Sequence, residues 1–197
     1  KAVEPKTVLG ITKRIGELLV HYVSNNNDYK KCKFTIVRFG NVIGSDGSAL
    51  PYFINQIKKD QSISVTDKKM QRYFMTIKET CELVLQSTLI NSKNKILFLD
   101  MGEPIKIVHI IKKIFDICKQ PNQKLKLKYI GNKFNEKISE KLSSKNIYYK
   151  TKFNKINFIK DKIKKKADIN KFLNLLDNKI NVYNNNKLFS LIKNFVK

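Results

Sequence analysis

The chain has 197 residues, 42% of them hydrophobic, so it can bury a core and is not expected to be disordered. Its 40 basic and 16 acidic residues give a formal net charge of +24, yet only three of the basic residues are arginine. Since sequence-specific DNA readers depend on arginine, and Lys, Asn and Ile are over-used throughout, we expect no specific nucleic-acid partner.

The first third of the chain predicts alternating helices and strands. Val8, Ile11 and Ile15 begin an apolar series at three- and four-residue spacing, which predicts a helix over 7–24. A short β-branched segment predicts a buried strand over 34–37, and a polar, glycine-containing loop follows over 38–48.

The rest of the chain continues this alternation, and the sequence therefore predicts an α/β fold. Thr76 and Glu79 have the spacing of a capping box at a helix start. The further elements expected are a helix over 51–59, strands over 63–65 and 72–75, a helix over 78–90, a strand over 96–99, a helix over 104–118, a strand over 125–129, a short helix around Ile138 and Leu142, a weak strand over 156–159, and helices over 169–176 and 187–195.

The segment Lys33–Ser48 is the strongest candidate for a ligand site. Ligands of open α/β sheets bind just beyond the carboxyl ends of strands, and this strand ends in a loop with three glycines. Asn41 offers both donors and an acceptor there. The cysteines and histidines show no metal-ligand spacing, so we predict no metal site.

Five motifs occur in order along the chain: KAVEP at 1–5, GITKR at 10–14, RFGNVIGS at 38–45, RYFMT at 72–76 and LDMGEP at 99–104. Together they resemble the nucleotide-sugar 4,6-dehydratases of polysaccharide biosynthesis, a branch of the extended short-chain dehydrogenases. Five motifs in order are far more specific than any one of them.

The resemblance implies the C-terminal part of a Rossmann-type domain with a smaller substrate-binding α/β domain. We expect residues 1–50 to end the NAD(P)-binding domain, 51–144 to form a mixed substrate-binding region with a returning Rossmann strand, and 145–197 to form a basic helical extension. No G-x-G-x-x-G loop occurs, so we expect a fragment that lacks the dinucleotide loop and is inactive alone.

The chemistry implied is loss of water across C5 and C6 of a UDP-N-acetylhexosamine, with UDP-N-acetylglucosamine the expected substrate and NAD(P) the cofactor. Lys1 matches the lysine of an Asp-Lys pair that supplies acid–base groups. Lys13 matches the helix lysine that binds the nicotinamide ribose and assists catalysis. Leu9 replaces the tyrosine usual four residues earlier, and leucine transfers no proton.

The same resemblance assigns substrate contacts. Asn41 is expected at the diphosphate or sugar, and Arg72 at phosphate oxygens, which its fork of donors suits. The segment 131–138 resembles the family's G-x-R-P-G-E-K-L. There Lys133 replaces the arginine that grips the UDP, and Glu136 retains the acid that helps hold the ribose.

Two other functions stay open at this point. One is a nucleotide-sugar 4-epimerase, which shares fold and cofactor but depends on the tyrosine that Leu9 replaces. The other is a non-catalytic, decayed copy or a basic binding module. No apolar run approaches the roughly 20 residues that cross a bilayer, so we expect a cytoplasmic location for this segment, with membrane association of the full-length protein and homo-oligomerisation left open.

Overall fold

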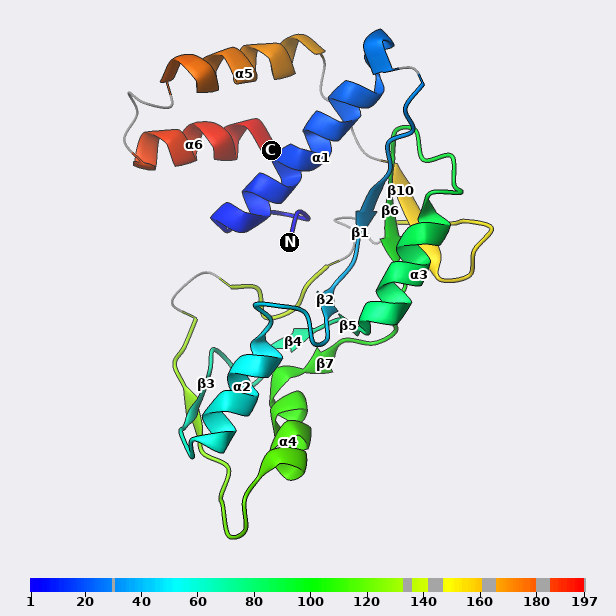
Figure 1. Cartoon of the computed structure of the whole chain (residues 1–197). Helices are drawn as coiled ribbons and strands as arrows, with labels where there is room; N and C mark the ends of the chain where they lie inside the picture. Colours follow the sequence, from blue (N-terminus) through cyan, green and yellow to red (C-terminus); the bar gives the residue numbers. More distant parts are fainter. Residues whose placement is uncertain (30, 133–135, 142–146, 161–165, 180–184, 197) are drawn as a thin grey trace.

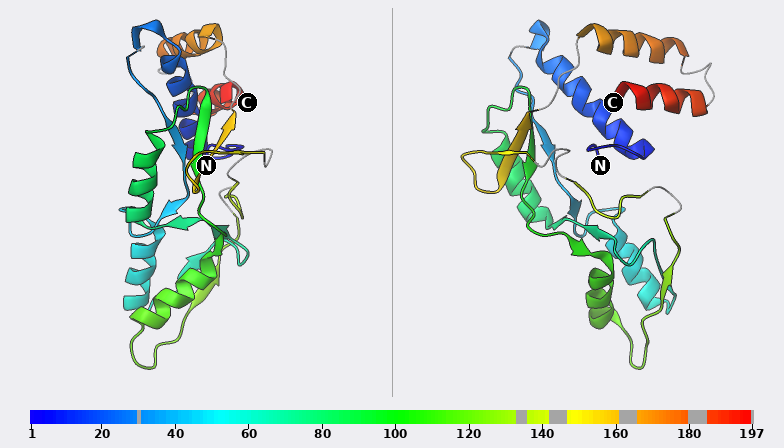
Figure 2. Two further views of the ribbon diagram at one scale, coloured as in Figure 1. Left: turned by 90° about the vertical axis from the view of Figure 1, so that its right-hand side faces the viewer. Right: turned by 180° about the vertical axis from the view of Figure 1, so that it is seen from behind.

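The computed structural model describes residues 1–29, 31–132, 136–141, 147–160, 166–179 and 185–196, and its fold is α/β (Figure 1). The upper part in Figure 1 contains a four-stranded sheet with helices on either side, and the lower part contains two helices beside a two-stranded sheet. Short strand pairs join the two parts, and the views in Figure 2 show the same elongated arrangement.

The upper sheet has the strand order β1-β6-β10-β9. β1 (Ile36–Arg38) and β6 (Lys95–Leu99) run parallel, whereas β10 (Ile156–Lys160) runs antiparallel to both β6 and β9 (Tyr149–Lys150). The central strand β6 is apolar and almost wholly buried, as expected for a strand covered on both faces. Its Leu97 and Leu99 pack with Leu83 of α3 (Ile77–Ser87).

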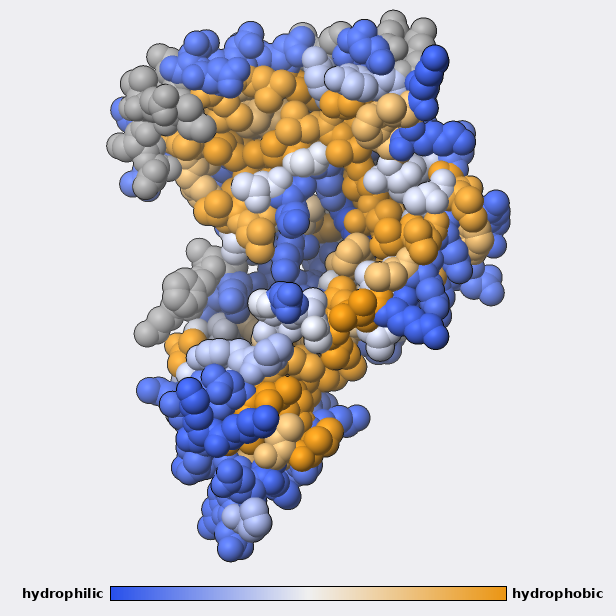
Figure 3. Space-filling view, viewed as in Figure 1, coloured by the Kyte–Doolittle hydropathy of each residue, from blue (hydrophilic) through white to orange (hydrophobic). Residues whose placement is uncertain are grey.

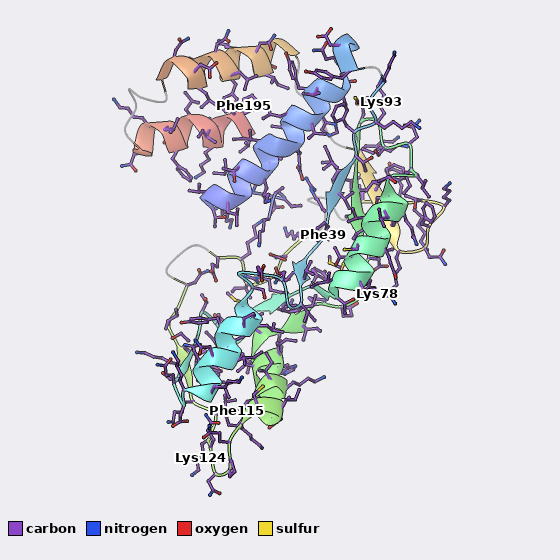
Figure 4. All side chains as sticks on the ribbon, viewed as in Figure 1. Phe39, Lys78, Lys93, Phe115, Lys124 and Phe195 are labelled. Atoms are coloured by element: carbon purple, nitrogen blue, oxygen red, sulfur yellow. The ribbon has the colours of Figure 1, made fainter. Side chains whose placement is uncertain are left out.

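Three helices form the other side of the upper part. α1 (Val8–Ser24) contacts α5 (Lys166–Lys179) and α6 (Asn185–Val196), and a 3-10 turn (Asn27–Tyr29) follows α1. Ile11 and Leu18 of α1 share a small core with Val196 of α6. Figure 4 marks Phe195 between α5 and α6, where its ring stacks on that of Phe172 with centroids 3.7 Å apart.

The lower part has its own core. α2 (Ala49–Lys58) packs on α4 (Ile107–Cys118), and β3 (Ile63–Val65) pairs in parallel with β8 (Leu127–Tyr129). α2 and α4 carry apolar residues at helical spacing, and β3 carries them at every second position. The two sets of side chains face each other and together form one core. Its buried members include Phe53, Ile57, Ile63, Val65, Ile111 and Phe115.

Two strand pairs lie between these parts and bring the motif residues together. β2 (Asn41–Val42) pairs in parallel with β5 (Phe74–Met75), in the register Asn41 to Phe74. β4 (Gln71–Arg72) pairs antiparallel with β7 (Ile105–Lys106). The segment after β1 and the segment before α3 are therefore tied side by side.

Most predicted elements are confirmed, and the differences have physical causes. The helix expected from Pro104 begins only at Ile107, because Ile105 and Lys106 pair with β4 instead. The strand expected over 72–75 divides at Tyr73, whose carbonyl accepts from Asn41 at 2.9 Å, and the loop expected over 38–48 contains β2. β9 was not predicted.

The short helix expected around Ile138 is wrong, because Ile138 lies in a bend and its carbonyl oxygen accepts from the Gln71 amide at 2.9 Å. Leu142 lies outside the described residues. The division of the chain at residues 50 and 144 stays a prediction. Within the described residues, no helix combines the length and the apolarity that a bilayer crossing requires.

Candidate functional site

The segment after β1 is held against its neighbours by a glycine. A Cβ atom on Gly40 would lie 2.7 Å from the Tyr73 carbonyl oxygen and 2.9 Å from Sδ of Met101. This loop is the predicted ligand site, and within it Gly40 admits the backbone that precedes β5. This close approach lets β2 form and fixes the position of Asn41.

The helix α1 presents the predicted catalytic lysine. Thr7 caps α1 by accepting a hydrogen bond from the Gly10 amide at 3.2 Å. Leu9, Lys13 and Glu17 are four residues apart and so share one side of the helix. Leu9 is 52% exposed and Lys13 is exposed, whereas Glu17 is buried.

Glu17 joins α1 to the sheet through Arg38, and Arg14 on α1 itself adds a second contact. Arg38 at the end of β1 donates to both its carboxylate oxygens, from Nε at 2.7 Å and from Nη2 at 2.8 Å. Arg14 adds a bond of 2.9 Å from Nη1. The side chains of both arginines are 14% exposed and that of Glu17 is 8% exposed. This bidentate contact fixes α1, and with it Lys13, relative to the segment that carries Asn41.

Arg72 lies in β4, and hydrogen bonds fix the position of its guanidinium group. Nη1 donates to the carbonyl oxygens of Gln71 at 2.8 Å and Ile138 at 3.1 Å. Its Nε lies 3.8 Å from Oε1 of Glu140, and both side chains are 13% exposed. A nearly buried guanidinium beside backbone carbonyls is pre-positioned to bind an anion.

Glu136 begins the described segment 136–141, which crosses the junction between the two parts. Its carboxylate accepts from the Thr66 hydroxyl at 3.1 Å, while its backbone exchanges two hydrogen bonds with the Asn132 side chain. The predicted UDP contact Lys133 lies outside the described residues.

These residues surround a pocket of about 400 Å³, which four of the predicted site residues line: Lys1, Asn41, Arg72 and Glu136. Lys13 lines a neighbouring cavity of about 320 Å³, which shares Lys1, Asn41, Glu140 and Lys141 with the first. Figure 3 shows a hollow with hydrophilic side chains between the part that contains α1 and the part that contains α2. Every predicted site residue that the structure describes therefore lines one or both of these adjoining cavities.

The larger pocket is electropositive. Its cationic lining residues are Lys1, Lys6, Arg72, Lys137 and Lys141, and its carboxylates are Glu136 and Glu140. Burial lowers the pKa of Lys137, whose Nζ donates to the Val3 carbonyl oxygen. Such a surplus of positive charge in a partly enclosed pocket favours an anion carrying several charges, such as a diphosphate.

Sequence reasoning missed two of the acidic residues that shape this site. Glu17 lies one helical turn after Lys13 within an otherwise apolar stretch, and that position could have suggested a buried partner for one of the few arginines. Glu140 follows a segment without regular structure, and nothing in its local pattern points to Arg72. That pairing arises only from the tertiary fold.

Comparisons with known proteins show the family of the chain. Residues 1–161 match the family described as "Polysaccharide biosynthesis protein". The chain is 42% identical over 146 residues to the "Capsular polysaccharide biosynthesis protein CapD" of Staphylococcus aureus, covering 74% of this chain and 24% of that protein. It is 33% identical over 144 residues to a "UDP-glucose 4-epimerase" of Rickettsia bellii, covering 73% of this chain and 41% of that protein.

A solved structure shares the architecture. The X-ray structure of Pen from Bacillus thuringiensis matches with a TM-score of 0.70 and 28% identity, covering 88% of this chain and 59% of that one. The fold is thus of the Rossmann type found in the extended short-chain dehydrogenases. The chain spans less than half the length of both curated relatives. It belongs to the polysaccharide biosynthesis protein family, as the match over residues 1–161 shows.

Proposed function

We propose that this chain forms the substrate-binding part of an NAD(P)-dependent nucleotide-sugar 4,6-dehydratase acting on a UDP-N-acetylhexosamine, with UDP-N-acetylglucosamine as the expected substrate. The observation that carries the proposal is the cationic pocket of about 400 Å³ around Lys1, Asn41 and Arg72. A pyrophosphate group matches its charge, and Arg72 supplies donors for phosphate oxygens.

The proposed role of each residue follows from its position around the two cavities. Arg72 and Asn41 would hold the diphosphate and the sugar, while Glu136, on the rim beside Thr66, would approach the ribose of the nucleotide. Lys133 stays a proposed UDP contact. Lys1 borders both cavities and so could serve a reacting sugar that bridges them.

The cavity beside Lys13 suits a nicotinamide ribose, because an exposed ammonium group there can donate to ribose hydroxyls. Bound NAD(P)+ would supply hydride transfer. Lys13 would hold the cofactor, and its positive charge would favour deprotonated oxygens nearby. Because Leu9 has no proton to transfer, the acid–base duties would fall on Lys1 and its partners.

A test is to express the full-length gene product and incubate it with UDP-N-acetylglucosamine and NAD(P)+. We expect a 4-keto-6-deoxy sugar nucleotide, detected by mass loss of one water. A folded, cofactor-loaded protein that forms no such product would contradict the proposed activity.

A second candidate is a nucleotide-sugar 4-epimerase, which the similarity to the Rickettsia bellii protein favours. Leu9 argues against it, since an epimerase needs a proton-transferring group at that position. The same incubation separates the two activities, because an epimerase would yield a C4 epimer of unchanged mass.

A further inference from the structure

We propose that Glu140 is an internal counter-ion of Arg72, which a ligand phosphate displaces, so that this carboxylate makes the pocket selective for multiply charged anions. The inference rests on the proposed function, because it assigns Arg72 to the diphosphate of the ligand. Its starting observation is that Arg72 and Glu140 both line this pocket and lie next to each other there, with Nε and Oε1 3.8 Å apart.

The geometry of the pair is that of a loose contact. Oε1 of Glu140 lies 3.8 Å from Nε of Arg72, which exceeds the usual N–H to oxygen distance of about 2.7–3.2 Å. The firm hydrogen bonds of the guanidinium go from Nη1 to the carbonyl oxygens of Gln71 and Ile138. Glu140 therefore neutralises Arg72 without holding it in place, and its departure would leave the guanidinium where it is.

Burial explains why a counter-ion is needed. Both side chains are only 13% exposed, and an unpaired charge at that depth is costly. A phosphate group would replace the carboxylate with more negative charge and with oxygens that fit the guanidinium fork. Since the two anions repel each other, they would not share Arg72. A ligand must therefore outcompete Glu140, which a singly charged anion does poorly.

The segment around Glu140 is held by contacts on both sides, so we expect its displacement to need only a change of side-chain rotamer. Before it, Ile138 accepts from the Gln71 amide at 2.9 Å, and Lys137 donates to the Val3 carbonyl oxygen. After it, Nζ of Lys141 lies 3.2 Å from Oε1 of Glu4. The lysines on either side of Glu140 would also stabilise its carboxylate once it leaves Arg72.

The experiment measures binding of inorganic pyrophosphate and of UDP-N-acetylglucosamine to the 197-residue chain by isothermal titration calorimetry. Glu140→Gln removes the competing charge and keeps the shape of the side chain. We expect it to bind pyrophosphate about tenfold more tightly than the wild type. Glu82→Gln on the exposed surface of α3 makes the same change in net charge, and we expect its affinity to stay within about twofold of the wild type.

A double-mutant cycle shows whether Glu140 acts through Arg72. In the Arg72→Gln background, Glu140→Gln should give a clearly smaller gain than in the wild type, because only direct repulsion between the carboxylate and the ligand remains to be relieved. Unchanged or weaker pyrophosphate binding by Glu140→Gln, an equal gain in both backgrounds, or no binding to either protein would overturn the inference. Glu140→Ala repeats the comparison if the glutamine variant does not fold by circular dichroism.

The two ligands separate this inference from the proposed function. A tenfold gain for pyrophosphate with no binding of UDP-N-acetylglucosamine supports the counter-ion and contradicts the nucleotide-sugar site. Binding of UDP-N-acetylglucosamine with no gain in Glu140→Gln supports the site and refutes the counter-ion.

Discussion

The contact between Glu17 and Arg38 makes a demanding prediction, because it joins α1 to the sheet through buried charges. Glu17→Ala removes a carboxylate that is 8% exposed and that accepts hydrogen bonds from Nε and Nη2 of Arg38. The variant leaves the Arg38 guanidinium, which is 14% exposed, without the carboxylate that it contacts.

The expected cost follows from this geometry. Removing one partner of a buried ion pair typically costs about 3–5 kcal/mol, because the remaining charge keeps its desolvation penalty. For a chain of this size, each 1 kcal/mol lowers the midpoint of thermal unfolding by about 2–4 °C, so we expect a fall of roughly 6–20 °C. Glu17→Gln keeps one acceptor oxygen and should fall between the wild type and Glu17→Ala.

Urea denaturation followed by circular dichroism measures this difference directly. Glu82→Ala, on the exposed surface of α3, is the matched control and should change the free energy of unfolding by no more than about 0.5 kcal/mol. If Glu17→Ala destabilised the chain no more than this control, the Glu17–Arg38 contact would not be what holds α1 to the sheet.

Three further predictions concern the same region. Gly40→Ala should lower the free energy of unfolding by about 1–3 kcal/mol in urea denaturation, because its Cβ would meet the Tyr73 carbonyl oxygen at 2.7 Å. Burial, with Glu103 and Asp100, raises the pKa of Tyr73, so the stability that its neutral form contributes is present below pH 10.0 and is lost as pH rises through the folded-state pKa. Wild-type protein should thus lose more stability than Tyr73→Phe as the pH rises above 10.0 in denaturation series. Lys13→Met in the full-length enzyme should lower kcat about 100-fold or more in the product assay while the protein stays folded.

Much of the local structure could be predicted from the sequence because its signals are local. Thr7 and Thr76 cap α1 and α3 as their types suggest, although the Glu79 side chain pairs with Lys155 at 2.7 Å instead of closing a capping box. Apolar spacing also predicted the helix α4, but the helix begins later in the chain than predicted. There Ile105 and Lys106 pair with β4, a long-range contact that periodicity does not encode.

The site residues likewise divide into those that the local sequence could indicate and those that only the tertiary fold reveals. Lys1, Asn41 and Arg72 could be proposed because they lie in motifs, and the structure places them around one pocket. Their roles stay predictions. The pairings Glu17–Arg38 and Glu140–Arg72 could not be assigned, since each forms only when distant segments pack together.

The central claim is that the pocket around Arg72 binds the diphosphate of a UDP-sugar. The most direct test is calorimetric titration of UDP-N-acetylglucosamine into the wild-type chain and into Arg72→Gln. We predict saturable binding to the wild type that weakens about tenfold or more in Arg72→Gln, because hydrogen bonds to a charged group contribute about 1.5–3 kcal/mol. Equal affinity of the two proteins, or no binding to the folded wild type, would contradict the claim.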